Sequence, residues 1–158
     1  MTNALSKMLS EREWILADGA TGTNLFNMGL MSGDAPELWN EQHPEKIKAL
    51  YKSAVDAGSD MFLTNSFGGN ASRLKLHSAQ DRAHDLSRMA AEIGRDVADA
   101  AGRPIVVAGS VGPTGDIMEP VGTLSHSDAV EIFHEQAEGL KAGGADVLWL
   151  ETISAPEE

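Results

Sequence analysis

Four short apolar runs in this sequence end in residues that can bind a ligand. Asp18-Gly19 follows the first run, Glu151 follows the last, and the polar segments 64–66 and 109–112 follow the two between them. A carboxylate at the end of a buried strand is costly to desolvate unless a positive group meets it. Two such carboxylates suit acid–base catalysis, metal binding or the binding of an ammonium group. A plain Asp-Gly turn at 18–19, and a surface or helix-capping role for Glu151, stay open as alternatives.

The other residues with chemical potential give weaker patterns. The glycine-rich segment 109–115 would let the backbone approach a ligand closely, but it has neither the lysine of a P-loop nor the spacing of a dinucleotide fingerprint. His77, His84 and His134 fall in helical segments without metal-ligand spacing, so we expect them to face solvent. A nucleotide-binding function is therefore disfavoured.

The elements that would position these residues alternate along the chain. Apolar periodicity predicts strands at residues 15–17, 61–65, 105–108 and 147–150. It predicts helices after Pro44, around Leu86–Val97, and from an N-cap at Ser127, with a short N-terminal helix and a long, partly helical connection over 25–42. This alternation is typical of parallel strands joined by crossover helices. In such a sheet the four polar strand ends share one face, where ligands bind.

The fold class predicted from this alternation is α/β, with a single domain over residues 1–158. A (β/α)8 barrel needs eight units and about 250 residues, so four units would form the first half of such a barrel. The alternative is an open sheet that stands on its own. A last strand without a following helix favours the N-terminal half of a larger barrel domain, with an exposed sheet edge that could self-associate.

Composition excludes several classes of protein. The 158 residues carry 24 acidic and 12 basic side chains, a net charge of −12, and no basic run, which argues against a nucleic-acid partner. There is no cysteine, so this chain alone can build neither a disulfide nor a thiolate metal site. Residues 1–14 do not resemble a signal peptide, and no apolar run is long enough to span a membrane. We expect a cytoplasmic protein.

Four motifs in order along the chain resemble the homocysteine S-methyltransferase family. They are DGATGTNL (18–25), LTNSFGGN (63–70), GSVGPTG (109–115) and LWLETI (148–153). The family includes betaine–homocysteine methyltransferases and the homocysteine module of cobalamin-dependent methionine synthase. The resemblance covers nearly the whole chain and implies a (β/α)8 barrel, in agreement with the alternation of elements.

The resemblance also implies a reaction, in which a zinc-bound homocysteine thiolate attacks an activated methyl group to give methionine. Asp18 and Glu151 match the family carboxylates that hold the amino group of the substrate, and Gly19, Asn65 and Ser110 would line the same pocket. The family's three zinc-binding cysteines lie in the second half of the barrel, beyond residue 158. No catalytic or metal-binding residue is thus expected in this chain, and the isolated chain should be inactive.

The methyl donor is not determined by the motifs. Betaine is favoured because an acidic site with an aromatic neighbour such as Trp39 would attract a quaternary ammonium, although plain packing of Trp39 is an equal alternative. Methylfolate and S-methylmethionine stay open. The competing hypothesis for the whole chain is a non-catalytic half-barrel that self-associates or binds a partner through its open sheet edge.

Overall fold

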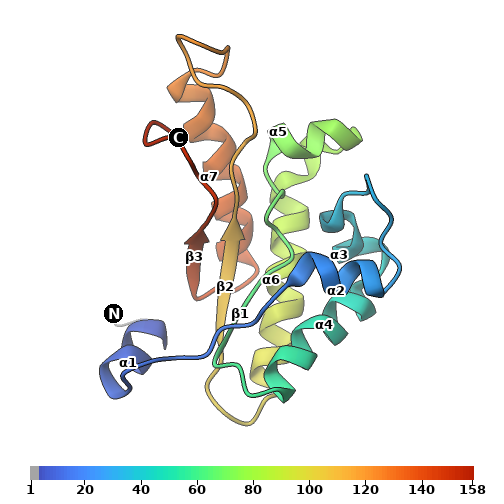
Figure 1. The fold of residues 1–158 in the computed structure, drawn as a ribbon, viewed down its shortest axis with the longest axis vertical. Coiled ribbons are helices and arrows are strands. Elements are labelled where there is room, and N and C mark those ends of the chain that lie inside the picture. The colour runs from blue at the N-terminus through green and yellow to red at the C-terminus, as the bar shows by residue number, and fades with distance from the viewer. Residues whose placement is uncertain (1–3) are drawn as a thin grey trace.

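A parallel sheet lies at the centre of the molecule, in a computed structural model that describes residues 4–158. Met1–Asn3, part of the N-terminal stretch considered above, lie outside the described residues. The strands of the sheet lie in the order β1 (Met61–Leu63), β2 (Val106–Val111) and β3 (Val147–Leu150), and adjacent strands are parallel. Figure 1 shows β2 and β3 pointing the same way. The predicted parallel α/β architecture is confirmed.

The prediction of a strand at residues 15–17 is wrong. This segment forms a single parallel bridge, between Ala17 and Met61. The pairing continues for one more bond, in which the Asp18 N–H donates to the Met61 carbonyl at 3.0 Å. The next donor, the Leu63 N–H, is taken by the Asp18 side-chain atom Oδ1 at 3.2 Å. A side-chain oxygen replaces the backbone acceptor, and the ladder ends there.

The other strand limits also differ from the prediction. Strand β1 ends at Leu63, two residues early, because the Asn65 N–H donates to the Tyr51 hydroxyl and not to a neighbouring strand. Strand β2 extends to Val111, since the Gly109–Val111 backbone pairs with β3.

Helices occupy the connections, largely as the periodicity predicts. Pro44 is the first residue of its helix, whereas the last long helix is capped by Ser125 and not by Ser127: the Ser125 Oγ accepts the Asp128 N–H at 3.1 Å. The helices are α1 (Ala4–Glu11), α2 (Thr21–Asn27), η1 (Pro36–Leu38), α3 (Trp39–Gln42), α4 (Pro44–Asp56), α5 (Ala71–Leu74), η2 (Lys75–His77), η3 (Gln80–Arg82), α6 (Ala83–Asp99) and α7 (His126–Ala142).

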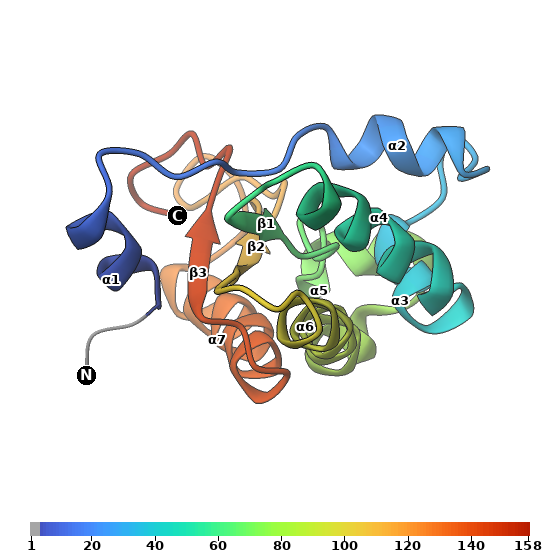
Figure 2. The ribbon, with the colours of Figure 1, turned by 90° about the horizontal axis from the view of Figure 1, so that it is seen from below.

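One face of the sheet packs against α4, α6 and α7, as Figure 2 shows from below. Phe62 and Val107 from this face join Ile47 and Tyr51 of α4 in the main core. The opposite face carries Met61, Val106 and Ala108, which pack against Met8 of α1. Helix α1 thereby covers the end of this face that lies far from the polar strand ends.

Strand β3 is the uncovered edge of the sheet. It pairs with β2 alone among the described residues, and Leu148 and Leu150 are 45% and 67% exposed. Beside it, an apolar groove of about 330 Å³ runs between α7 and β3 and is lined in part by Val130, Phe133 and Ile153. Within residues 4–158, no helix has the length and apolarity required to cross a bilayer.

The bond between Tyr51 and Asn65 provides a test of this architecture. Tyr51 is fully buried, and its hydroxyl lies 2.6 Å from the Asn65 nitrogen. Tyr51→Phe leaves that N–H without an acceptor, so we expect the free energy of unfolding to fall by about 1–3 kcal/mol in urea denaturation. Ser10→Ala, which removes the exposed bond from Ser10 Oγ to the Lys7 carbonyl, should change it by about 0.5 kcal/mol or less. Equal losses in both variants would contradict the assigned role of Tyr51.

Candidate functional site

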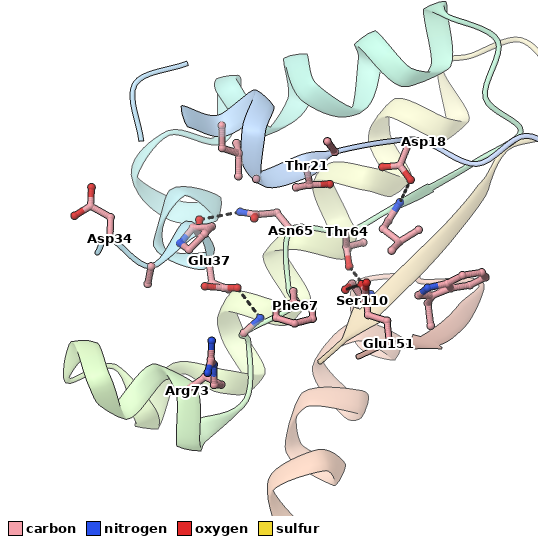
Figure 3. Close-up of a pocket in the computed structure, with 18 of the residues that line it drawn as sticks. Asp18, Thr21, Asp34, Glu37, Thr64, Asn65, Phe67, Arg73, Ser110 and Glu151 are labelled. Carbon is pink, nitrogen blue, oxygen red and sulfur yellow. Dashed lines mark hydrogen bonds between the residues drawn. The ribbon is translucent and has the colours of Figure 1, made fainter. Parts of the chain in front are cut away.

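A cavity of about 590 Å³ opens at the carboxyl ends of the strands. All five site residues predicted from the sequence line it: Asp18, Gly19, Asn65, Ser110 and Glu151. Figure 3 shows the labelled side chains around this cavity, with Asp18 coming from the N-terminal segment and Glu151 from the end of β3. The expectation that these strand ends share one face is met. What the five residues bind stays a prediction.

Asp18 is a partly buried carboxylate at this cavity. The pKa of Asp18 is raised from its ordinary value of 3.8 to about 6, mainly by burial and to a smaller extent by the negative charge of Glu151. The N–H groups of Leu63 and of Asp18 itself oppose this increase in the pKa. A carboxylate that is costly to keep charged gains most from a cation in the cavity.

Glu151 is held in place by Ser110. The Ser110 Oγ donates to Glu151 Oε1 at 2.5 Å, and the Glu151 N–H donates to the Val111 carbonyl at 3.0 Å. The Ser110 N–H in turn donates to the Thr64 hydroxyl at 3.1 Å. The carboxylate of Glu151 is thus held by the Ser110 hydroxyl and its backbone by Val111, which orients Glu151 relative to Asp18.

The segment from Thr64 to Asn70 forms a buried wall of the cavity and has no regular secondary structure. Its carbonyl at Ser66 accepts a bond from Gln136 Nε2 of α7 at 2.6 Å, and the Ser66 hydroxyl donates to the Ser110 carbonyl at 2.7 Å. Asn70 donates its side-chain amide toward the Gly112 carbonyl at 3.5 Å. Side chains therefore supply the hydrogen bonds that a strand or helix would otherwise make.

Asn65 has a mainly structural set of bonds. Its side-chain nitrogen donates to the Pro36 carbonyl at 2.8 Å and to Asn40 Oδ1 at 2.9 Å. The backbone carbonyl of Asn65 accepts a bond from Asn40 Nδ2 at 2.9 Å. The side-chain donor of Asn65 is thus engaged within the protein, although the residue lines the cavity as predicted.

Three charged residues of the cavity were missed by the sequence analysis: Asp34, Glu37 and Arg73. Glu37 is 5% exposed and accepts the Gly68 N–H at 2.7 Å; burial raises its pKa, while the charges of Arg73 and His77 oppose that change. Gly68 leaves room for this bond, since a Cβ there would lie 3.0 Å from Glu37 Oε1. The available signal for Arg73 was a basic residue three positions after the LTNSFGGN motif in a strongly acidic chain.

The aromatic residues of the cavity are Phe67 and Trp149, not Trp39. Trp39 is 6% exposed and packs edge-on against His43, with the Lys46 Nζ 4.3 Å from its ring centre. Its ring already has a cation as a neighbour and lies outside the cavity lining. The expectation that Trp39 could contact a quaternary ammonium is wrong, and the alternative of plain packing is correct.

One histidine lies in a different environment from the one predicted. His77, expected to face solvent, is partly buried and lines the cavity. Within residues 4–158 no group of three or more histidine, aspartate or glutamate side chains is arranged to hold a metal ion, and the chain has no cysteine. The described residues do not fit a zinc site.

Comparison with protein families gives a match over nearly the whole chain. A family model described as homocysteine S-methyltransferase matches residues 15–158. Methionine synthases of Mycobacterium tuberculosis and Mycobacterium leprae are 34% and 32% identical to the chain over 157 residues. These alignments cover 94% of the chain but 13% of either relative, so the chain spans a small part of their length.

Solved structures give a consistent result. The homocysteine methyltransferase MmuM from Escherichia coli, in its metallated form, superposes with a TM-score of 0.78 at 26% identity. Its oxidised form gives 0.75 at 25% identity. The matches cover 96% and 92% of this chain and 58% and 55% of the MmuM chain. The chain therefore corresponds to little more than half of that structure.

The coupling between the two carboxylates can be measured directly. We expect an NMR titration of side-chain carboxyl signals to give Asp18 a pKa of about 6. Glu151→Gln removes the neighbouring negative charge, so the pKa of Asp18 should fall while staying above 3.8, because burial is the larger cause. Glu119→Gln, at an exposed carboxylate outside the cavity lining, should leave it unchanged. An Asp18 pKa that is insensitive to Glu151→Gln would contradict the coupling.

Proposed function

Because the chain belongs to the homocysteine S-methyltransferase family, we propose that it forms the homocysteine-binding half of an enzyme that methylates homocysteine to methionine. In this reaction the substrate sulfur forms a bond to a methyl group as the donor's bond to that methyl breaks, and the thiol proton is lost. The chain would contribute the pocket for the amino-acid part of homocysteine. The methyl donor and the thiol-activating groups are separate questions.

The observation that carries this proposal is the pair of carboxylates on one cavity. Asp18 and Glu151 would bind the ammonium group of homocysteine between them. Burial makes the charged form of Asp18 costly, and a bound ammonium would offset that cost as well as the repulsion from Glu151. Ser110 would act through Glu151, which its hydroxyl contacts. Gly19 and Asn65 would line the same subsite.

Zinc belongs to the proposal for the larger enzyme and not to this chain. The described residues contain no suitable set of ligands. We therefore propose that the zinc-binding cysteines implied by the family lie beyond residue 158, and that this chain alone transfers no methyl group. Its part would be to bind and orient the substrate.

We further propose that residues 1–158 make up the first four units of a (β/α)8 barrel and one half of a single barrel domain. The bridge at Ala17 and strands β1, β2 and β3 follow one another in parallel order, as four successive barrel strands would. A fifth strand would pair with the open edge of β3. Such an enzyme would be cytoplasmic, with small-molecule substrates.

Betaine is retained as the favoured methyl donor, on different residues from those first considered. Phe67 and Trp149 line the cavity together with its carboxylates, and aromatic faces attract quaternary ammonium groups. Methylfolate and S-methylmethionine remain alternatives. Methyl transfer by the complete enzyme from each donor in turn would identify the one it uses.

Homocysteine binding to the chain tests the ammonium site. Loss of a charge-assisted contact costs about 1.5–3 kcal/mol, so Asp18→Asn and Glu151→Gln should each raise the Kd for homocysteine by about 10- to 150-fold in isothermal titration calorimetry. Affinity in the unmodified chain should also fall as the pH drops below about 6, because Asp18 becomes protonated. In the complete enzyme both variants should keep their zinc.

Asp116→Asn serves as the matched control, since it removes one exposed carboxylate outside the cavity lining. Its Kd for homocysteine should equal that of the unmodified chain. If both site variants also bind homocysteine normally, Asp18 and Glu151 lose their assigned role.

A second candidate function is a non-catalytic half-barrel that self-associates through its sheet edge. The exposure of Leu148 and Leu150 on β3, beside an apolar groove, favours it. An unpaired strand edge with exposed apolar side chains promotes association between chains.

Light scattering coupled to size-exclusion chromatography separates the two candidates. If β3 normally pairs with the second half of a barrel, adding that half should convert associated chains into a one-to-one complex. Leu150→Lys should reduce self-association because it places a charge on the exposed edge strand, whereas Val121→Lys, at an 85% exposed position in a loop away from β3, should not. A defined dimer that ignores the added half would favour the non-catalytic candidate.

A further inference from the structure

Arg73 is a cavity-lining cation whose guanidinium has no partner among residues 4–158. It lies in α5 and is partly buried at the cavity. Among residues 4–158, no carboxylate oxygen lies within 4.0 Å of its guanidinium, and no hydrogen bond joins that group to another residue. In a chain with 24 acidic residues, most arginines find such a partner. An unpaired guanidinium in a cavity is suited to bind an anionic ligand group.

The nearby Glu37 does not form an ion pair with Arg73. The Glu37 Oε1 accepts the Gly68 N–H at 2.7 Å, and the charge of Arg73 lowers the pKa of Glu37 without a direct contact. The five hydrogen-bond donors of the guanidinium therefore stay available to a ligand.

Residues 110–115 show where Arg73 lies relative to the ammonium site. Ser110 contacts Glu151 at one end of this segment. Gly112 lies close to the Phe67 ring, since an added Cβ would be 2.5 Å from it, and Gly115 lies close to Arg73, since an added Cβ would be 3.0 Å from Nη1. The segment thus passes the carboxylates, then the aromatic ring, then the guanidinium. Figure 3 shows the same order, with Phe67 between Arg73 and the pair Ser110–Glu151.

This order separates Arg73 from the carboxylate of a bound homocysteine. The ammonium and carboxylate of an α-amino acid are attached to the same carbon, so both must lie near Asp18 and Glu151. Arg73 lies beyond Phe67 in a cavity of about 590 Å³, a volume typical of sites for ligands well above amino-acid size. This volume leaves space for a second small molecule beside a bound amino acid.

We propose that Arg73 binds the carboxylate of the methyl donor, with the donor's cationic methyl centre against Phe67. The ligand class is a small carboxylate that carries an onium group, of which betaine is the simplest. The inference rests on the proposed methyltransferase function and deepens it by assigning a donor subsite. A guanidinium for the carboxylate and an aromatic face for the onium group complement the two charges of this ligand.

Calorimetric titration of the 158-residue chain with betaine and with choline tests the subsite, because choline keeps the quaternary ammonium and lacks the carboxylate. The unmodified chain should bind betaine more tightly than choline. Arg73→Gln should raise the Kd for betaine by about 10- to 100-fold and leave choline unaffected, and Arg73→Lys should have an intermediate effect. Circular dichroism should confirm that each variant is folded.

Lys75→Gln is the matched control, since Lys75 is an exposed cation two residues away that does not line the cavity. It should bind betaine as the unmodified chain does. Three results would overturn the proposal: equal binding of betaine and choline by the unmodified chain, no binding of either, or an unchanged Kd for betaine in Arg73→Gln. The comparison of the two probes in the unmodified chain holds even if Arg73→Gln fails to fold.

Homocysteine titrations of the same samples distinguish this proposal from the one on which it rests. If Arg73→Gln weakens homocysteine and not betaine, Arg73 belongs to the amino-acid site and the donor subsite is wrong. If homocysteine fails to bind the unmodified chain while betaine binding depends on Arg73, the assigned homocysteine site is wrong and the anion-binding role of Arg73 survives.

Discussion

The wall formed by residues 64–70 imposes the main constraint on this structure, because it buries backbone without forming a strand or helix. Each buried N–H and carbonyl must find a partner inside the protein. The partners come from separate elements: Asn40 of α3, Tyr51 of α4 and Gln136 of α7. Three helices are thus tied to one irregular segment. The position of this wall of the site is therefore determined by the packing of the surrounding helices.

The same arrangement explains why the cavity has a well-supported wall and also charged side chains that form no ion pair. Polar side chains of the wall bond mostly to Pro36, Asn40 and the backbone of residues 110–113, and among the described residues none of them bonds to a cavity carboxylate. Ser110 connects the two, since it bonds both to Thr64 of the wall and to Glu151. Within residues 4–158, neither Asp18 nor Arg73 has a side-chain partner of opposite charge, and in the proposed function charged ligands would take that place.

Sequence reasoning identified the parallel architecture and placed Asp18 and Glu151 on one face because both depend on local pattern: an apolar run followed by a polar end. Gly19, Asn65 and Ser110 were added to the cavity by the family resemblance. It failed where contacts between distant segments decide. Trp39 is buried by packing against Lys46 and His43, which no spacing rule reveals. Residues 15–17 lack a full ladder because one side chain interrupts it. Arg73 gives no periodic signal, and only the folded structure shows that no carboxylate among residues 4–158 lies beside its guanidinium.

The bond from the Leu63 N–H to Asp18 Oδ1 places the same carboxylate in the strand pairing and in the proposed ammonium site. One oxygen of the carboxylate acts as the last rung of the sheet, so a change in the charge of Asp18 changes the strength of that rung. Protonation of Asp18, or a cation bound to it, would weaken or reorient the acceptor of the Leu63 N–H. The amide hydrogen of Leu63 thus becomes a built-in reporter, whose exchange with solvent records what occupies the cavity.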